Sequence, residues 1–286
     1  MFGDTLALTV RSLKKWIRNP AAIFPGLFMA VFWLALFGNS FNPLNLIPSQ
    51  LGGTTLSPMI VEQIKAAMTS VFGGATNYIT FLTAGVIVFT VIINMAYGGI
   101  DIVLDRQLGY LNSLLTAPIS RASIFFSGAL QNFVKAMFIA LLTFIVALLI
   151  PNGLILGTGF GILNFLGVFT AVALVTFGFG CLFSAVAFSV KVVDSLVAII
   201  NFLAFPIVFM SSAMFPLTTF PSWLKSIAEV NPVTKATETA RLLIVNSVLS
   251  QAQLSMLAGN MLYLVTFAIA LAVIGYLIAR KSLMAE

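Results

Sequence analysis

Long apolar stretches separated by short polar connections dominate this sequence. A helix needs roughly 20 apolar residues to cross about 30 Å of hydrocarbon. Stretches of about this length or longer cover residues 21–38, 78–100, 124–150, 160–190, 192–215 and 258–279. Because backbone polar groups in lipid must be satisfied within one segment, such stretches predict helices rather than strands. The pattern therefore predicts an all-α membrane protein, with six transmembrane helices in a single domain of residues 1–286.

The longest uncharged run lies between Lys135 and Lys191, and it is too long for one span. Pro151-Asn152-Gly153 supplies a turn that splits this run. The sequence therefore predicts a helical hairpin here. Lys135 lies some way into the first helix of the hairpin, and we expect its amine to reach the cytoplasmic surface by snorkelling.

Residues 1–19 precede the first span, and their apolar and basic residues repeat with the period of a helix. Apolar residues fall on one face at about 100° per residue, namely Leu6, Val10, Leu13 and Ile17. Basic residues fall on the other face, namely Arg11, Lys14, Lys15 and Arg18. This pattern predicts an amphipathic helix in the cytoplasmic headgroup layer, which Asn19-Pro20 ends. A simple anchoring role and a role in contacting a partner are both open.

Two longer connections carry most of the prolines outside the predicted spans. In residues 39–77, Ser57-Pro58 is suited to cap and start a short helix that runs to Ala67. In residues 216–257, repeated prolines interrupt any continuous span. We therefore expect short outer or re-entrant helices before the sixth span.

The distribution of Lys and Arg gives the orientation, because cytoplasmic loops carry an excess of both. With both termini inside, the cytoplasmic side receives Arg11, Lys14, Lys15, Arg18, Arg106, Arg121, Lys191, Arg280 and Lys281. The outer side receives Lys65, Lys225, Lys235 and Arg241. The bias predicts a multi-pass protein of the plasma membrane with cytoplasmic N- and C-termini.

Composition excludes most catalytic chemistry. The chain has no His, one Cys (Cys181) and eight carboxylates, so the usual zinc sites and the Ser-His-Asp or Cys-His catalytic sets cannot be assembled. No Walker-A motif, G-x-x-x-x-G-K-[ST], occurs. The net charge of +6 is spread along segments that flank the membrane, which favours the positive-inside effect over nucleic-acid binding. We expect no metal site, no catalytic residues and no nucleic-acid partner.

Residues 104–121 form a charged segment with leucines between the second and third spans. A short helix there would place an apolar ridge of Leu111, Leu114 and Leu115 in a cleft of a soluble partner. Gly109 and Pro118 would fix where this helix begins and ends. The segment is therefore predicted to couple the membrane helices to a partner; an ordinary cytoplasmic loop is the alternative.

Taken with the amphipathic N-terminus and the six spans, two motifs resemble those of ABC type-2 transporter permeases over nearly the whole chain. The first is Gly109-x-Leu111-x-x-Leu114-Leu115-x-x-Pro118, and the second is Asn231-Pro232-Val233-Thr234 followed by Glu238 and Arg241. The resemblance is closest to membrane subunits of bacterial and archaeal drug-resistance exporters. It implies that residues 104–121, with Arg106, hold the coupling helix, and that Asn231, Pro232, Glu238 and Arg241 form the family's outer motif.

The resemblance also implies partners. A separate ATPase subunit would bind ATP and Mg and drive export of a hydrophobic or amphipathic substrate such as a drug, lipid or glycan. A second permease copy is expected, as a homodimer or a heterodimer, within the lipids of the membrane. Lys14, Lys15 and Arg18 of the amphipathic helix would support the contact with the ATPase.

A substrate pathway is predicted from polar and aromatic positions in the second and fifth spans. Thr90 and Asn94 share a helical face with Thr83 and Tyr97. The fifth span offers Asn201, Phe202, Phe205 and Phe209 at comparable depth. Such a polar stripe opposite an aromatic face would suit an amphipathic cargo, although ordinary helix packing also uses small and polar residues.

Two other classes of protein remain as alternatives. An ion-gradient-driven transporter or channel would need ion sites within the membrane, and the sequence shows no series of acidic residues in its spans. A membrane-embedded enzyme or assembly factor is disfavoured because the usual catalytic residues are missing.

Overall fold

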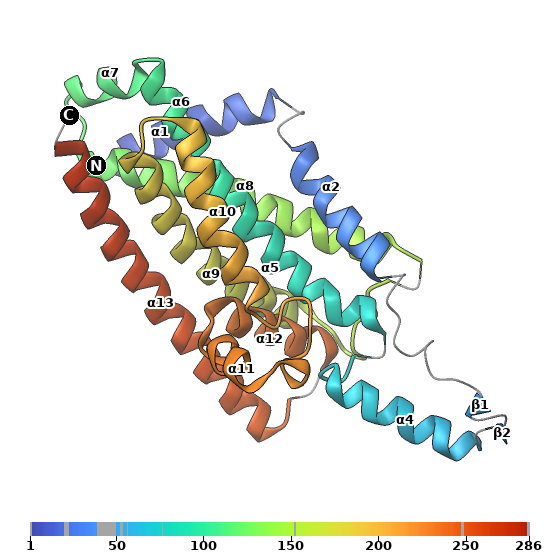
Figure 1. Cartoon of the computed structure of the whole chain (residues 1–286). Helices are drawn as coiled ribbons and strands as arrows, with labels where there is room; N and C mark the ends of the chain where they lie inside the picture. Colours follow the sequence, from blue (N-terminus) through green and yellow to red (C-terminus); the bar gives the residue numbers. More distant parts are fainter. Residues whose placement is uncertain are drawn as a thin grey trace.

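The computed structural model describes residues 2–19, 23–38, 50–51, 54–55, 57–75, 77–151, 153–246 and 249–284. Helices make up most of this part of the chain (Figure 1). They are α1 (Phe2–Ile17), α2 (Phe24–Phe32), the π-helical segment η2 (Trp33–Phe37), α4 (Pro58–Val71), α5 (Tyr78–Gly98), α6 (Ile100–Gln107), α7 (Tyr110–Thr116), α8 (Arg121–Leu149), α9 (Ile162–Ser189), α10 (Val193–Phe209), the 3-10 turn η4 (Leu217–Thr219), α11 (Ser222–Val230), α12 (Pro232–Val245) and α13 (Gln251–Met284). Two antiparallel strands, β1 (Gln50–Leu51) and β2 (Thr54–Thr55), are the only strands among the described residues.

Four helices are long and apolar enough to cross a membrane. They are Tyr78–Gln107, which joins α5 and α6, then Arg121–Leu149, Ile162–Ser189 and Gln251–Ser282. The first and fifth predicted spans, 21–38 and 192–215, coincide with shorter apolar helices, Phe24–Phe37 and Val193–Phe209. The described residues thus contain four helices of spanning length and two shorter apolar helices, an arrangement consistent with a helical membrane protein.

The end of the fifth predicted span differs from the prediction. The helix ends at Phe209, not at residue 215, and the chain turns through Ser211 and Met214. This turn packs directly on α5, because a Cβ on Gly85 would lie 1.6 Å from the Ala213 carbonyl oxygen. Tyr78, the first residue of α5, donates a hydrogen bond of 3.1 Å to the Met214 carbonyl. Side chains distant in sequence therefore stop this span early.

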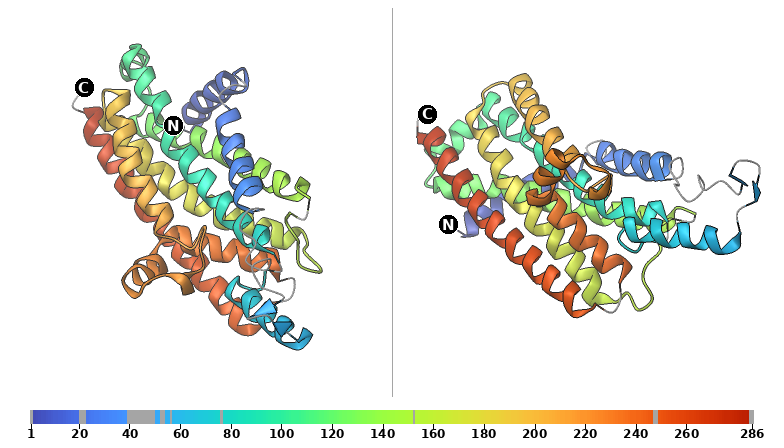
Figure 2. Two further views of the ribbon diagram at one scale, coloured as in Figure 1. Left: turned by 45° about the vertical axis from the view of Figure 1, so that its right-hand side comes forward. Right: turned by 60° about the horizontal axis from the view of Figure 1, so that its bottom comes forward.

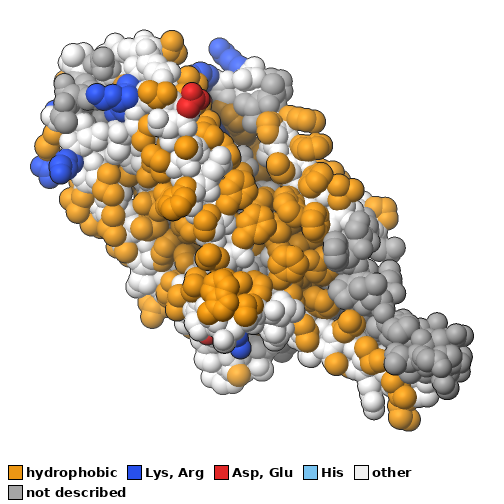
Figure 3. Space-filling view, in the orientation of Figure 1, with side chains coloured by type: hydrophobic (Ala, Val, Ile, Leu, Met, Phe, Trp, Pro, Cys, Tyr) orange, Lys and Arg blue, Asp and Glu red, His pale blue; other side chains and the backbone are white. Residues whose placement is uncertain are grey.

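The helices form one elongated bundle with two distinct ends. Both termini and α7 lie at one end, and α11, α12 and α4 lie at the other (Figures 1 and 2). The most extensive helix contact joins α9 to α13, and α5 contacts α8, α9, α10 and α12. Hydrophobic side chains cover the visible flank of the bundle, whereas Lys and Arg side chains gather at the α7 end (Figure 3). This face of the bundle is thus apolar along its flank and basic at the α7 end.

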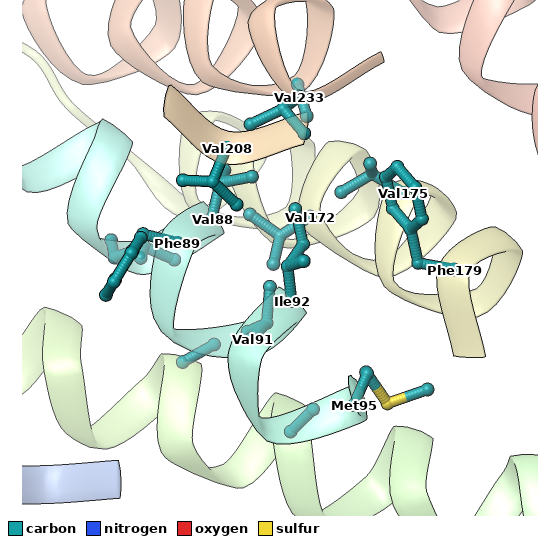
Figure 4. Packing of buried hydrophobic residues seen from close by; sticks show 14 of the residues in the cluster. Val88, Phe89, Val91, Ile92, Met95, Val172, Val175, Phe179, Val208 and Val233 are labelled. Atoms are coloured by element: carbon teal, nitrogen blue, oxygen red, sulfur yellow. The ribbon is translucent and has the colours of Figure 1, made fainter. Parts of the chain in front are cut away.

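The core lies around α5, which is almost entirely buried. Its Val88 and Ile92 pack against Val172 of α9, and Val208 of α10 and Val233 of α12 lie in the same cluster (Figure 4). In contrast, α13 is largely exposed along its length. An exposed apolar helix of this kind suits contact with lipid.

Near the α12 end, α4 begins where the sequence predicts. Ser57 caps the helix by accepting a hydrogen bond from the Ile60 N–H at 3.4 Å, and Pro58 occupies the first turn. The helix runs to Val71, four residues past the predicted end at Ala67. Most of the predicted outer segment before it, residues 39–49, lies outside the described residues.

Candidate functional site

The α7 end carries the segment predicted to contact a partner. Between α6 and α7, Gly109 adopts φ +75°, and nothing lies within 4 Å of the position its Cβ would occupy. The left-handed conformation, not lack of space, therefore requires glycine here. The seven-residue helix α7 follows and ends before the exposed Pro118. Residues 104–121 thus form two short helices at a sharp corner.

The leucines of this corner face differently from the prediction. Leu111 is only 3% exposed and packs in the core, so it cannot belong to an exposed ridge. Leu114 is half-buried and lines a small pocket beside Leu111. The Leu115 side chain lies outside what the structure describes. Among the described leucines of this segment, Leu108 is the most exposed, at 78%, because it lies at the corner where α6 has already ended.

The N-terminal helix α1 lies against this corner. The Arg11 guanidinium stacks over the Tyr110 ring with 3.7 Å between its Cζ and the ring centroid. The Lys15 ammonium lies 3.8 Å from a carboxylate oxygen of Asp105. Lys14, Lys15 and Arg18 are exposed. The apolar residues Leu6, Val10 and Ile17 are also exposed, as expected of a helix whose apolar face meets lipid headgroups.

Arg106 connects the same corner to the spanning helices. One terminal nitrogen donates to the Val190 carbonyl and the other donates to the Phe188 carbonyl, both at 2.6 Å. The Ser282 hydroxyl of α13 donates to the same Phe188 carbonyl at 2.6 Å. Because carbonyls at a helix C-terminus have no partner within the helix, α9 presents a binding site for the guanidinium. Arg106 therefore fixes α6 to the end of α9, and Ser282 brings the end of α13 to the same Phe188 carbonyl.

A cavity of about 480 Å³ lies among α2, α5 and α8, and we call it the membrane pocket. Its lining is mostly apolar, and it also includes the predicted pathway residues Thr90 and Asn94. The Asn94 amide donates to the Thr90 carbonyl at 2.8 Å. The Thr90 hydroxyl lies 3.5 Å from the Thr143 hydroxyl of α8. Thr90 and Asn94 therefore look toward α2 and α8, whereas Tyr97 of the same predicted stripe contacts α10.

At the α7 end of the membrane pocket lies an ion pair that the sequence did not reveal. The Lys135 ammonium of α8 lies 2.7 Å from a carboxylate oxygen of Asp101. The Lys135 side chain is only 12% exposed, and its ammonium is held by Asp101. A charge buried this far needs a partner, and α6 supplies one.

The predicted pathway residues of α10 separate into two groups. Asn201 accepts a hydrogen bond of 2.7 Å from the Tyr97 hydroxyl of α5. Phe202 is 78% exposed, and Phe205 and Phe209 are partly exposed and stack on each other. The structure thus joins Asn201 to α5, and it leaves the phenylalanines on the outer surface of the described chain.

The predicted outer motif forms a structural bracket at the α12 end. Asn231 caps α12 by accepting from the Val233 N–H, and its amide donates to the carbonyls of Ile207 and Met210. Pro232 occupies the first turn of α12. The motif therefore binds the end of α10 to the start of α12.

Arg241 is the buried cation of this bracket. Its guanidinium stacks 3.7 Å from the Phe81 ring centroid and donates to the carbonyls of Phe81 and Ser212. Burial lowers the pKa of Arg241 to about 10, which still leaves it protonated at neutral pH. Burial also raises the pKa of the Glu238 carboxyl, a rise that the positive charge of Arg241 opposes. The bracket is thus a charged site outside the spanning helices.

The pattern of the family described as ABC-2 type transporter matches residues 4–245. The chain belongs to this family. It is 33% identical over 239 residues to the transport permease ycf38 of Porphyra purpurea, covering 82% of this chain and 71% of the relative. It is 31% identical to the permease of the same name from Pyropia yezoensis, covering 85% and 74%. It is 28% identical to the daunorubicin resistance ABC transporter permease protein DrrB1 of Streptomyces coeruleorubidus, covering 68% of each chain.

Permeases of the ABC-2 family are membrane transport subunits that work with ATP-binding subunits and are generally not catalytic themselves. The residues that the structure describes in this ABC-2 permease contain no group of three His, Cys, Asp or Glu side chains placed to hold a metal ion.

Three site residues of this ABC-2 permease were missing from the predicted set. Asp101 is 34 positions from its partner Lys135, so no local pattern linked them. Tyr110 was visible as an aromatic residue beside Gly109, but its cation partner Arg11 lies in a distant helix. Leu108 precedes the glycine, outside the apolar spacing of α7. An unusual Lys within an apolar run was the one signal in the sequence for the Asp101 pair.

Proposed function

We propose that this chain is the permease subunit of an ATP-binding-cassette exporter that moves a hydrophobic or amphipathic substrate out of the cytoplasm. A separate ATPase subunit binds ATP and Mg and supplies the energy. The chain lies in the plasma membrane with both termini in the cytoplasm. The drug-resistance permease among its relatives supports export as the direction of transport.

One observation carries this proposal, namely the way Arg106 joins an exposed corner to the spanning helices. Leu108, Ser113 and Pro118 are exposed on the corner, so a cytoplasmic partner can reach them. Arg106 binds the C-terminal end of α9 through the carbonyls of Phe188 and Val190, just before the turn that leads into α10. A push on the corner therefore reaches helices of the bundle directly. This is the connection that an ATPase needs if it is to move the membrane helices.

The α1 helix extends this contact surface. Arg11 stacks on Tyr110, and Lys15 lies near Asp105, so α1 is held beside α7. The exposed Lys14 and Arg18 give this surface a positive charge, which suits an acidic surface on the ATPase. Lys14, Lys15 and Arg18 therefore belong to the proposed coupling surface together with Arg106, Gly109, Leu114 and Pro118.

A second permease copy completes the proposed transporter. Phe202, Phe205 and Phe209 form an exposed aromatic face on α10. Large aromatic side chains are favoured at protein interfaces, and a second copy is the occupant that the family supports. Thr90, Asn94 and Asn201 line or adjoin the interior surfaces along which the substrate passes.

The source of energy distinguishes this proposal from ion-gradient transport, for which Asp101 and Lys135 would be the candidate ion site. The experiment uses inside-out vesicles that contain the permease and its co-expressed ATP-binding subunit, with a fluorescent amphiphile as cargo. Uptake that requires ATP and persists with an ionophore supports the exporter. Uptake that needs no ATP and is lost with the ionophore overturns it in favour of ion coupling.

A further inference from the structure

The membrane pocket joins a long apolar wall to one charged end. Pro25, Met29, Phe89 and Ile93 supply apolar surface from α2 and α5. Asp101 and Lys135 lie at the α7 end of the same cavity. A volume of about 480 Å³ lies within the range of sites that bind drug-sized molecules. The pocket is therefore shaped for a molecule with an apolar body and one polar end.

The α2 wall comes close to α5 at a glycine. A Cβ on Gly26 would lie 3.0 Å from the Asn94 amide and 3.3 Å from a terminal carbon of Ile139. Any larger side chain at this position would enter the cavity or press on these neighbours. Gly26 therefore allows α2 to approach α5 closely where it lines the membrane pocket.

Trp16 of α1 closes the pocket toward the α7 end. Its ring packs edge-on against Phe138 of α8 at 5.6 Å between centroids. Beyond Trp16 lies a second, small cavity of about 70 Å³ that shares Asp101 and also includes Asp105 and Lys15. The polar end of the membrane pocket is thus next to a charged, water-facing region.

The two charges at this end differ in how accessible they are. The Lys135 side chain is 12% exposed, and its ammonium is committed to Oδ2 of Asp101 at 2.7 Å. The Asp101 side chain is 43% exposed. A molecule that enters the pocket therefore meets the carboxylate more readily than the ammonium. An ammonium group on that molecule would form a charge-assisted hydrogen bond with Asp101 in partly desolvated surroundings.

We propose that the membrane pocket binds a drug-sized amphiphile that carries a protonated amine, with Asp101 as the acceptor for the amine. Lys135 is the internal cation that occupies Asp101 until the ligand arrives. The apolar body lies along Phe89, Ile93 and Met29. This proposal rests on the proposed function, because it names the substrate class of the exporter, but it is tested by binding alone.

Three probes that share one fluorescent group and differ in charge test whether binding requires an amine. They are monodansylcadaverine, its N-acetylated neutral analogue and dansyl-6-aminohexanoic acid, which carries a carboxylate. Each is titrated onto the purified full chain in lipid nanodiscs at neutral pH, where the primary amine is protonated, and empty nanodiscs supply the background. We expect the amine to bind about tenfold more tightly than the neutral analogue, the size of one charge-assisted hydrogen bond.

Substitutions at the ion pair give opposite expected results. Asp101→Asn should abolish the preference for the amine probe and leave the neutral probe unchanged. Lys135→Met should tighten binding of the amine probe severalfold, because Asp101 loses its internal partner. If the Asp101–Lys135 pair only stabilised the fold, both variants would weaken the binding of all three probes equally. Asp194→Asn, which changes an exposed carboxylate of α10 outside the pocket, is the control and should bind as wild type.

Gly26→Leu tests the location independently of the ion pair. It should weaken binding of all three probes, because its side chain fills the cavity. An amine preference that survives Asp101→Asn, equal binding of the three probes, or tighter binding of the carboxylate probe overturns the proposal. If the Asp101→Asn variant does not insert into the membrane, the Lys135→Met variant and the comparison of the three probes on the wild type test the proposal instead. Charge-selective binding without ATP-dependent transport would overturn the exporter and not the pocket, and the converse result would overturn only the pocket.

Discussion

The guanidinium of Arg106 donates a 2.6 Å hydrogen bond to the Val190 carbonyl, and this contact joins the corner between α6 and α7 to the turn between α9 and α10. The two residues are 84 positions apart in the sequence. A second bond from Arg106, to Phe188, makes the connection directional as well as strong. Motion of the corner is therefore shared with the end of α9 and with the turn that leads into α10.

Arg106→Gln is expected to uncouple the transporter. The shorter, neutral amide cannot bind both carbonyls, and a hydrogen bond from a charged group contributes about 1.5–3 kcal/mol. The variant should still insert and bind the ATPase subunit, while substrate transported per ATP hydrolysed falls about tenfold or more. Arg280→Gln, at an exposed position near the same end, is the matched control. If Arg106→Gln transported as much substrate per ATP hydrolysed as the wild type, the hydrogen bonds of Arg106 to Phe188 and Val190 would not transmit motion.

Two glycines in helices predict opposite effects of the same substitution. Gly85→Ala would place a Cβ 1.6 Å from the Ala213 carbonyl oxygen, so α5 and the turn after α10 must separate. Overpacking of this kind costs about 1–3 kcal/mol or more. Gly259→Ala meets nothing within 4 Å and should stabilise α13 by about 0.5–1 kcal/mol. Thermal unfolding in detergent measures both, and equal melting temperatures would contradict the close approach at Gly85.

The helical class and most helix positions follow from the sequence, because apolar length and Pro-Gly turns are local signals. The start of α4 at Ser57-Pro58 and the helices at the apolar stretches are examples. The end of α10 at Phe209 is not local, since it depends on Asn231 reaching back to Ile207 and Met210.

The site was less predictable than the fold. Seven residues of α7 are too few for an apolar face to be assigned from spacing, so Leu111 was placed outside and Leu108 was missed. The stripe of Thr90 and Asn94 was found correctly as one helical face, but only tertiary packing decides which neighbour that face meets. Both lie toward α2 and α8.

Removal of the buried cation at the α12 end should destabilise the protein. Arg241→Met keeps the apolar stem over Phe81 but leaves the carbonyls of Phe81 and Ser212 without this donor. Each buried group that loses its partner costs about 1–3 kcal/mol, so we expect a loss of about 2–4 kcal/mol and a lower melting temperature. Lys235→Met on the same helix, which is only half-buried, should change little. Equal melting temperatures for the two variants would show that Arg241 does not stabilise the fold.

Glu238 gives the α12 end a pH dependence with a defined sign. Burial raises its pKa in the folded protein above the ordinary value of 4.5. The folded state therefore binds this proton more tightly than the unfolded state. The contribution of this proton to the free energy of unfolding is complete below about pH 4.5, and it is lost as the pH rises through the pKa of Glu238 in the folded protein.

Glu238→Gln should remove this dependence. Its melting temperature should exceed that of wild type at about pH 8, and the difference should shrink toward about pH 5, where the wild-type carboxyl is more protonated. Glu229→Gln, with its exposed side chain, serves as the comparison. A Glu238→Gln variant that is less stable than wild type at the higher pH would mean that its attraction to Arg241 outweighs the cost of burial.

The exposed leucine of the corner tests the central claim most directly. Leu108→Asn removes an apolar contact at a position that is 78% exposed, and Leu163→Asn makes the same change at a position that is 79% exposed at the start of α9. Each tagged variant is purified in mild detergent from membranes that contain the ATP-binding subunit, and the amount of that subunit per permease is measured. We predict that Leu108→Asn loses the subunit while Leu163→Asn retains it at the wild-type ratio. Full retention by Leu108→Asn, or a wild-type permease that purifies alone, would contradict the coupling surface.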